Sequence, residues 1–330
     1  MLMVYWINRK VIRRRIRRDR VSLDEGTAEV LKTIILIVMP IIFSAFIYNV
    51  NSYINSYMYT DILGRKGMDE GLLQTMYAEF GYFGTLINIP LTLASTAPTS
   101  MIPEVSAHYA KKDLRAANQK IDRAAWISMI ISIPSAIGLA VLADPVTRLI
   151  FPGTNSVAGK LMILGAITII LNGNSNITNG VLQGIGKPNI PMIHAAIALG
   201  TDVAAMFLLL NLTDLGIYSV VIAMCIYAVV MCLLNEFSIR KYLGYKTPWR
   251  MAYLNPLIAS VPMALTAGGV YYGLYYFLQR NFLCLVPAIF LAVVVYFMVY
   301  LLVSHPTEEE LSMLPGGRYL SAFAGRFARS

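Results

Sequence analysis

The sequence predicts an all-α integral membrane protein with eight transmembrane helices. Of its 330 residues, 57% are hydrophobic and only 14% are charged, and the mean hydropathy is +0.61. Soluble domains are closer to one-quarter charged, so this composition excludes a water-soluble protein. The uncharged runs are about 20 residues long, which is the length that an α-helix needs to cross the hydrocarbon core. They also lack the two-residue alternation of membrane β-barrel strands.

Eight such runs follow one another along the chain. Backbone polar groups in hydrocarbon must pair within their own segment unless a barrel closes, so each run is predicted as a helix. The predicted spans are Val30–Val50, Tyr82–Ile102, Ala124–Leu142, Leu161–Gln183, Ile190–Leu212, Leu215–Ser238, Leu254–Leu278 and Phe282–Val303.

The two ends of the chain are not predicted to cross the membrane. Residues 1–8 are apolar but too short to span, and they precede a block from Arg9 to Arg20 that holds eight of the 27 basic residues. We interpret residues 1–29 as the remnant of a preceding helix and a basic cytoplasmic linker near anionic lipid. Residues 305–330 are predicted as a cytoplasmic tail, either a surface-lying amphipathic helix or a frayed end.

Lys and Arg are divided unevenly between the two sides of the predicted membrane. Segments that share a side with the N-terminus hold 22 of these residues and the other connections hold five. Cytoplasmic segments carry the excess of positive charge, so both termini are predicted inside. Positive charge dispersed among apolar runs excludes nucleic acid as a partner. No metal-ligand spacing is present around the three cysteines, so neither a metal nor a cofactor is expected.

Asp202 is the charged side chain that lies deepest in a predicted span. An ionised carboxylate at the bilayer centre costs ~2.5–3.5 kcal/mol on insertion scales, so Asp202 is expected to face protein or a cavity. His194 and Thr201 lie on the same helix and add polar groups to its stripe. Contact with an ion, a proton or a headgroup is one interpretation. A protonated Asp202 that hydrogen-bonds to a neighbouring helix is the other.

Polar side chains also recur at helical spacing on three further predicted spans. Such groups commonly join helices to one another, so a single stripe indicates packing. Three stripes among eight helices favour a shared, water-filled cavity. The candidate cavity residues on these stripes are Asn51, Asn55, Asn88, Thr92, Asn172, Asn176, Asn179 and Gln183.

Prolines lie inside several of the predicted spans. Each removes a backbone hydrogen bond and permits the helix to bend, and bendable helices around a polar cavity suit alternating access. The predicted hinges are Pro40, Pro90, Pro134 and Pro262.

One pair of residues has the spacing of a catalytic dyad. His108 and Asp113 form His-x4-Asp, as in glycerolipid acyltransferases. That chemistry needs a folded acceptor site around the pair, and the predicted loop is too short to build one. The chain is therefore predicted not to be an enzyme.

Three segments carry a family resemblance. They are FGYFGTLINIPLTLASTAPTSMIPEVSAHYAKKD from Phe80 to Asp113, VLQGIGKPNIP from Val181 to Pro191, and EEELSMLPGGRYL from Glu308 to Leu320. These segments resemble the polysaccharide-biosynthesis branch of the multidrug/oligosaccharidyl-lipid/polysaccharide exporter superfamily, nearest to stage V sporulation protein B and the lipid II flippases.

The resemblance implies a MATE-like flippase fold, in which two six-helix lobes and two extra C-terminal helices surround a cavity. Residues 30–240 would form the second lobe, and residues 241–304 would form the extra pair. The first lobe, which supplies much of the cationic cavity lining in that family, would be missing. The implied partners are a lipid-linked sugar, membrane lipids, and either the missing N-terminal lobe or a second copy. The implied location is the bacterial plasma membrane.

We therefore predict a flippase or exporter of lipid-linked oligosaccharide or polysaccharide precursors that works by alternating access. Two alternatives remain open. A cation-coupled small-molecule or multidrug exporter would use Asp202 as its coupling site. A non-transporting membrane assembly protein would use the same polar stripes as packing surfaces.

Overall fold

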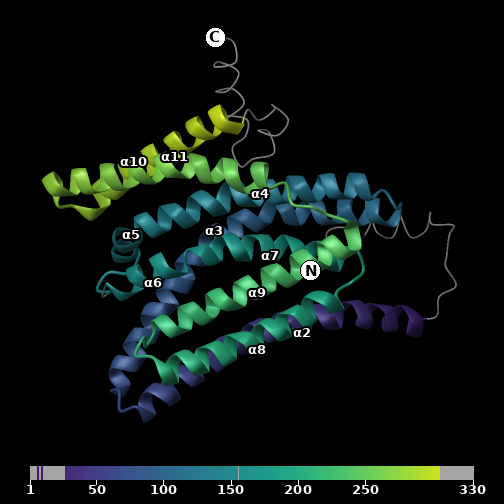
Figure 1. The fold of residues 1–330 in the computed structure, drawn as a ribbon, viewed down its shortest axis with the longest axis horizontal. Helices are drawn as coiled ribbons and strands as arrows, with labels where there is room; N and C mark the ends of the chain where they lie inside the picture. The colour runs from purple at the N-terminus through teal and green to yellow at the C-terminus, as the bar shows by residue number, and fades with distance from the viewer. Residues whose placement is uncertain (1–5, 7–8, 10–26, 155, 305–330) are drawn as a thin grey trace, which may run out of the picture. The chain divides into compact units, whose positions relative to one another are not determined.

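The computed structural model describes Trp6, Arg9 and residues 27–154 and 156–304, and every regular element within these ranges is a helix (Figure 1). The chain divides into two compact units, residues 1–40 and residues 41–330. In the first unit, helix α2 (Thr27–Arg65) begins, and it continues into the second unit. The predicted linker, residues 1–29, lies almost wholly outside the described residues, and the predicted tail, residues 305–330, lies entirely outside them.

The second unit is built from helices that run back and forth beside one another (Figure 1). Consecutive long helices pack as pairs, α3 with α4, α8 with α9 and α10 with α11, and α7 packs against α3, α4 and α9. After α2, the elements are α3 (Glu70–Ala110), α4 (Leu114–Val141), α5 (Ala143–Ile150), α6 (Val157–Gly165), α7 (Ile167–Gly184), α8 (Asn189–Leu212), α9 (Tyr218–Leu243), the π-helix η1 (Arg250–Leu254), α10 (Asn255–Leu278) and α11 (Asn281–Ser304).

Six of the described helices are long and apolar enough to cross a membrane: α2, α4, α8, α9, α10 together with η1, and α11. Helices α6 and α7 make a seventh candidate if they count as one broken span. The predicted span Tyr82–Ile102 lies in α3, where repeated Thr, Ser and Asn residues lower the hydropathy. The prediction of an all-α protein with several membrane-spanning helices is confirmed, and the number eight stays a prediction.

The prediction of one continuous helix from Leu161 to Gln183 is wrong. The chain bends by 49° between α6 and α7. At the end of α6, Gly165 lies so close to the buried ring of Phe83 that a β-carbon there would overlap it. The chain therefore bends where it packs closely against α3, and the sequence from Leu161 to Gln183, which contains no proline, does not reveal the break.

Helix α4 carries the predicted hinge Pro134, and its neighbour α11 completes the backbone hydrogen bonding there. Proline has no N–H to donate to the carbonyl of Ile130, four residues earlier. The Tyr296 hydroxyl of α11 donates to that carbonyl over 2.9 Å. One turn away, Trp126 Nε1 donates to Tyr300 Oη over 2.6 Å. All of these side chains are buried, so α11 is fastened to α4 at two consecutive turns.

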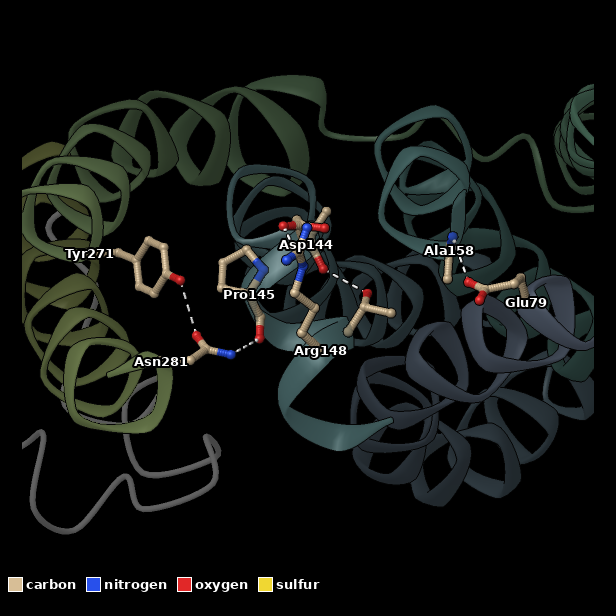
Figure 2. A network of polar contacts seen from close by, with 9 residues as sticks. Glu79, Asp144, Pro145, Arg148, Ala158, Tyr271 and Asn281 are labelled. Carbon is tan, nitrogen blue, oxygen red and sulfur yellow. Dashed lines mark hydrogen bonds and ion pairs between the residues drawn. The ribbon is translucent and has the colours of Figure 1, made fainter. Parts of the chain in front are cut away.

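Hydrogen bonds also join the connection between α10 and α11 to α5 (Figure 2). Tyr271 Oη donates to Asn281 Oδ1 over 3.0 Å, and Asn281 Nδ2 donates to the Pro145 carbonyl over 2.9 Å. In the same region, the amide of Ala158 in the first turn of α6 donates to Glu79 Oε2 over 3.0 Å. A carboxylate at a helix N-terminus is favourable because it complements the helix dipole. These contacts hold the short α5–α6 segment between α3 and the α10–α11 pair.

Candidate functional site

A polar cavity of about 310 Å³ lies between α2, α3, α7 and α9. Of the predicted cavity residues, Asn88 and Thr92 reach it from α3, and Asn172, Asn176 and Asn179 reach it from α7. Its lining residues are Tyr48, Asn88, Leu91, Thr92, Ser95, Asn172, Asn176, Asn179, Tyr227 and Met231. Within the described part of the chain, amides, hydroxyls and phenols therefore provide its polar groups, and no charged side chain lines it.

Helix α3 separates this polar cavity from an apolar one. Asn88, Thr92 and Ser95 face the polar cavity, whereas Ile89 and Leu93 face an apolar cavity of about 390 Å³. The apolar cavity is completed by α4, α5, α10 and α11, and it includes the predicted hinges Pro90 and Pro134. Polar and apolar spaces therefore lie on two sides of one helix. This arrangement is suited to a molecule with both a polar and an apolar part.

Asp202 lies near the middle of α8 and is fully buried. Asn51 and Asn55 of α2 lie within electrostatic reach of its carboxylate, yet neither carboxylate oxygen meets hydrogen-bond geometry with a described residue. The side-chain oxygens of Asn51 and Asn55 are also buried without a hydrogen-bond partner. Because buried polar groups are normally paired, these three oxygen-bearing side chains form a second candidate contact site. They do not line the polar cavity themselves, but Asp202 lies within electrostatic reach of Tyr227, which does.

His194 takes part in a buried network that joins α7, α8 and α9. Its Nδ1 lies 2.7 Å from Asn235 Oδ1, and its Nε2 lies 3.2 Å from Ser238 Oγ. Asn235 Nδ2 donates to Asn179 Oδ1 over 2.8 Å and to Thr178 Oγ1 over 3.1 Å. Asn235 is fully buried at the centre of this network. Asn235 was not predicted, because α9 contains no second amide at helical spacing from it.

The remaining predicted residues are placed as follows. Thr201 Oγ1 donates to the carbonyl of Ala198 in its own helix over 2.8 Å. Gln183 is half-buried near the end of α7. Pro40 and Pro262 lie inside α2 and α10.

The His108–Asp113 pair lies where α3 ends and α4 begins. His108 Nδ1 is 3.8 Å from Asp113 Oδ2, and Asp113 Oδ1 accepts the amide of Ala116 over 3.1 Å as the N-cap of α4. Close by, the hydrogen bond and positive charge of Lys120 lower the pKa of Glu104. This region has the features of a helix-capping turn with an exposed ion pair.

Comparison with known proteins assigns this arrangement to a family. The family model described as "Lipid II flippase MurJ" matches residues 15–295. The lipid II flippase MurJ of Bacillus subtilis (strain 168) is 21% identical over 168 residues, which are 50% of this chain and 30% of that protein.

Two solved structures have a similar fold. A lipid II flippase MurJ in an inward closed conformation has a TM-score of 0.64 at 17% identity, over 87% of this chain and 57% of that one. An outward-facing multidrug resistance MATE family transporter of the MOP superfamily has a TM-score of 0.50 at 16% identity, over 88% of this chain and 68% of that one. The likeness confirms the predicted superfamily fold. The chain spans little more than half the length of the solved flippase.

Proposed function

Because the chain belongs to the lipid II flippase MurJ family, we propose that it forms the half of a lipid-linked precursor flippase that contains the second lobe and the extra helix pair. It is a multi-pass membrane protein of the bacterial plasma membrane, and it is a transporter rather than an enzyme. In this proposal α3 is the eighth span. Residues 30–240 form the lobe, and residues 241–304 form the extra pair.

The two-sided arrangement around α3 is the observation that carries this proposal. A lipid-linked sugar has a polar headgroup and a long apolar chain, and the cavities on the two faces of α3 match these two parts. Because the described lining residues are uncharged, a facing partner would bind the charged pyrophosphate. That partner is either a first lobe or a second copy. Family membership supports lipid II as the substrate class. The sporulation-protein branch suggested by the sequence remains a proposal.

A second candidate function is cation-coupled export of a small molecule. The MATE-like structural similarity and the unpaired carboxylate of Asp202 favour it. This alternative places the coupling ion or proton at Asp202, Asn51 and Asn55. It predicts transport that depends on a cation gradient and does not require a lipid-linked sugar.

We predict that the 330-residue chain alone does not flip lipid-linked sugars and that a first lobe restores the activity. A carrier of this kind moves one lobe against another around a midplane site, so one lobe leaves the cavity open. Vesicles would carry a fluorescent polyprenyl-pyrophosphate disaccharide whose outer-leaflet fraction is quenched chemically. With the chain alone, the quenched fraction should equal that of protein-free vesicles. With a first lobe fused upstream of Met1, the quenched fraction should rise because the lipid is flipped. The first lobe alone is the control.

Robust flipping by the purified chain alone would refute this half-transporter proposal. It would instead favour a homodimer that encloses the cavity. If the fused protein exports a small molecule in a way that depends on a cation gradient and does not flip the lipid, the second candidate is favoured.

We also propose that both termini are cytoplasmic, because the connections predicted on that side hold most of the Lys and Arg residues. In a cysteine-free background, Arg65→Cys should react with an impermeant thiol reagent in intact cells. Arg115→Cys should react only after permeabilisation. The opposite labelling pattern would reverse the orientation.

A further inference from the structure

The network between α7, α8 and α9 determines which atoms of Asn179 face the polar cavity. At one end of this network, the Thr178 hydroxyl lies 3.0 Å from the Asn174 carbonyl and 3.1 Å from the Ser175 carbonyl of its own helix. A hydroxyl has one hydrogen to donate. Since this hydrogen is directed to the backbone of α7, Thr178 Oγ1 can only accept from Asn235.

Asn235 must therefore turn its NH₂ group toward α7. One of its hydrogens goes to Thr178 Oγ1, and the other goes to Asn179 over 2.8 Å. The atom of Asn179 that receives this hydrogen must be an acceptor, so it is Oδ1. On the other side, Asn235 Oδ1 is 2.7 Å from His194 Nδ1, which must then carry a hydrogen. The oxygen and nitrogen atoms of both amides are therefore assigned from the donors and acceptors around them.

The consequence is that the NH₂ group of Asn179 remains for the cavity that this residue lines. Resting on the proposed function, we propose that Asn235 is a positioning residue that makes Asn179 an N–H donor to an oxygen of the substrate headgroup. The acceptor belongs to an uncharged part of the headgroup, such as a sugar hydroxyl or an acetamido carbonyl. No charged side chain among the described lining residues offsets the desolvation of a phosphate.

The first test measures the orientation of the amide and does not depend on transport. The full chain, labelled with ¹⁵N-asparagine, would be studied by NMR in lipid nanodiscs. The side-chain NH₂ signal of Asn179 would be assigned by its loss in Asn179→Asp. We expect this NH₂ to exchange with water in the wild-type chain. In Asn235→Asp the carboxylate has no hydrogen to donate, so Asn179 should turn its NH₂ toward it and become protected from exchange.

The second test measures binding of two probes to the same nanodiscs by native mass spectrometry. One probe is polyprenyl pyrophosphate linked to an N-acetylated disaccharide, and the other is polyprenyl pyrophosphate without sugar. Asn235→Asp should weaken binding of the sugar-bearing probe by about tenfold or more, because a donor is replaced by an acceptor. Binding of the sugar-free probe should be unchanged. Asn179→Asp removes the donor directly at the cavity wall and should have the same effect even if Asn235→Asp folds poorly.

Thr168→Val is the matched control, because it removes a buried hydroxyl of the same helix, which donates to the Gly165 carbonyl and lies outside the network of Asn235. It should bind both probes as the wild type does. An Asn179 NH₂ that is already protected in the wild type would overturn the proposal. Equal weakening for both probes would also overturn it, since the acceptor would then be the phosphate. If the variants bind as the wild type does, the positioning role is wrong and the flippase function stands. If no form binds either probe, both are wrong.

Discussion

Replacing Asp202 with asparagine should reduce transport by about tenfold or more while the protein becomes no less stable. The carboxylate is fully buried in α8, and its polar neighbours Asn51 and Asn55 are not aligned well enough to form strong hydrogen bonds with it. A buried charge without partners lowers stability, and asparagine keeps the shape of aspartate without the charge. A tenfold loss of rate corresponds to a rise of about 1.4 kcal/mol in the activation barrier.

Opposite changes in activity and stability would distinguish a functional carboxylate from a structural one. Transport would be measured in the two-lobe fusion at several pH values and cation concentrations, and thermal unfolding would be measured in detergent. Asn51→Leu serves as a companion variant, because it removes a neighbouring oxygen without changing the charge. If Asp202→Asn transports at the wild-type rate across pH, then the carboxylate has no role in transport and only the structural interpretation remains.

The second large effect is expected at the break between α6 and α7. Gly165→Ala should lower the free energy of unfolding by about 1–3 kcal/mol, because its methyl group would overlap the Phe83 ring in a fully packed core. In Gly138→Ala, by contrast, the new methyl group would lie 3.7 Å from Met263, an ordinary contact. This control should unfold at about the wild-type temperature.

A second substitution shows whether the overlap is the cause. Phe83→Leu in the Gly165→Ala background should recover part of the lost stability, because the smaller side chain makes room for the methyl group. Unfolding of each variant would be followed by circular dichroism in one detergent. If Gly165→Ala is as stable as the wild type, the packing of Gly165 against Phe83 leaves room for a methyl group and the prediction is wrong.

The periodic features of the sequence correspond well to the structure. Asn88 and Thr92 are one helical turn apart, as are Asn172 and Asn176, and the structure brings all four to one cavity. Their grouping was predictable because helical spacing places such residues on one face. Their role in transport stays a prediction.

Features that depend on a single contact between distant segments were not predictable. Asn235 is the only amide residue of α9, and only the folded chain shows its contacts with His194 and Asn179. Asn51 and Asn55 were grouped with the cavity by their spacing, yet they lie beside Asp202. Glu236 of α9 accepts the Thr247 hydroxyl over 2.6 Å, another contact that no pattern in the sequence predicts.

The hydrogen bond from Tyr296 to the Ile130 carbonyl implies that α4 and α11 must be exchanged together when segments are swapped between related proteins. Alone in hydrocarbon, α4 would carry an unpaired carbonyl at its proline, and such a group costs several kcal/mol. A chimaera that takes α4 from this chain and the counterpart of α11 from a relative without a tyrosine at position 296 would have this defect. Viable recombinants should therefore keep the two helices from the same parent, although more than one hundred residues of sequence separate them.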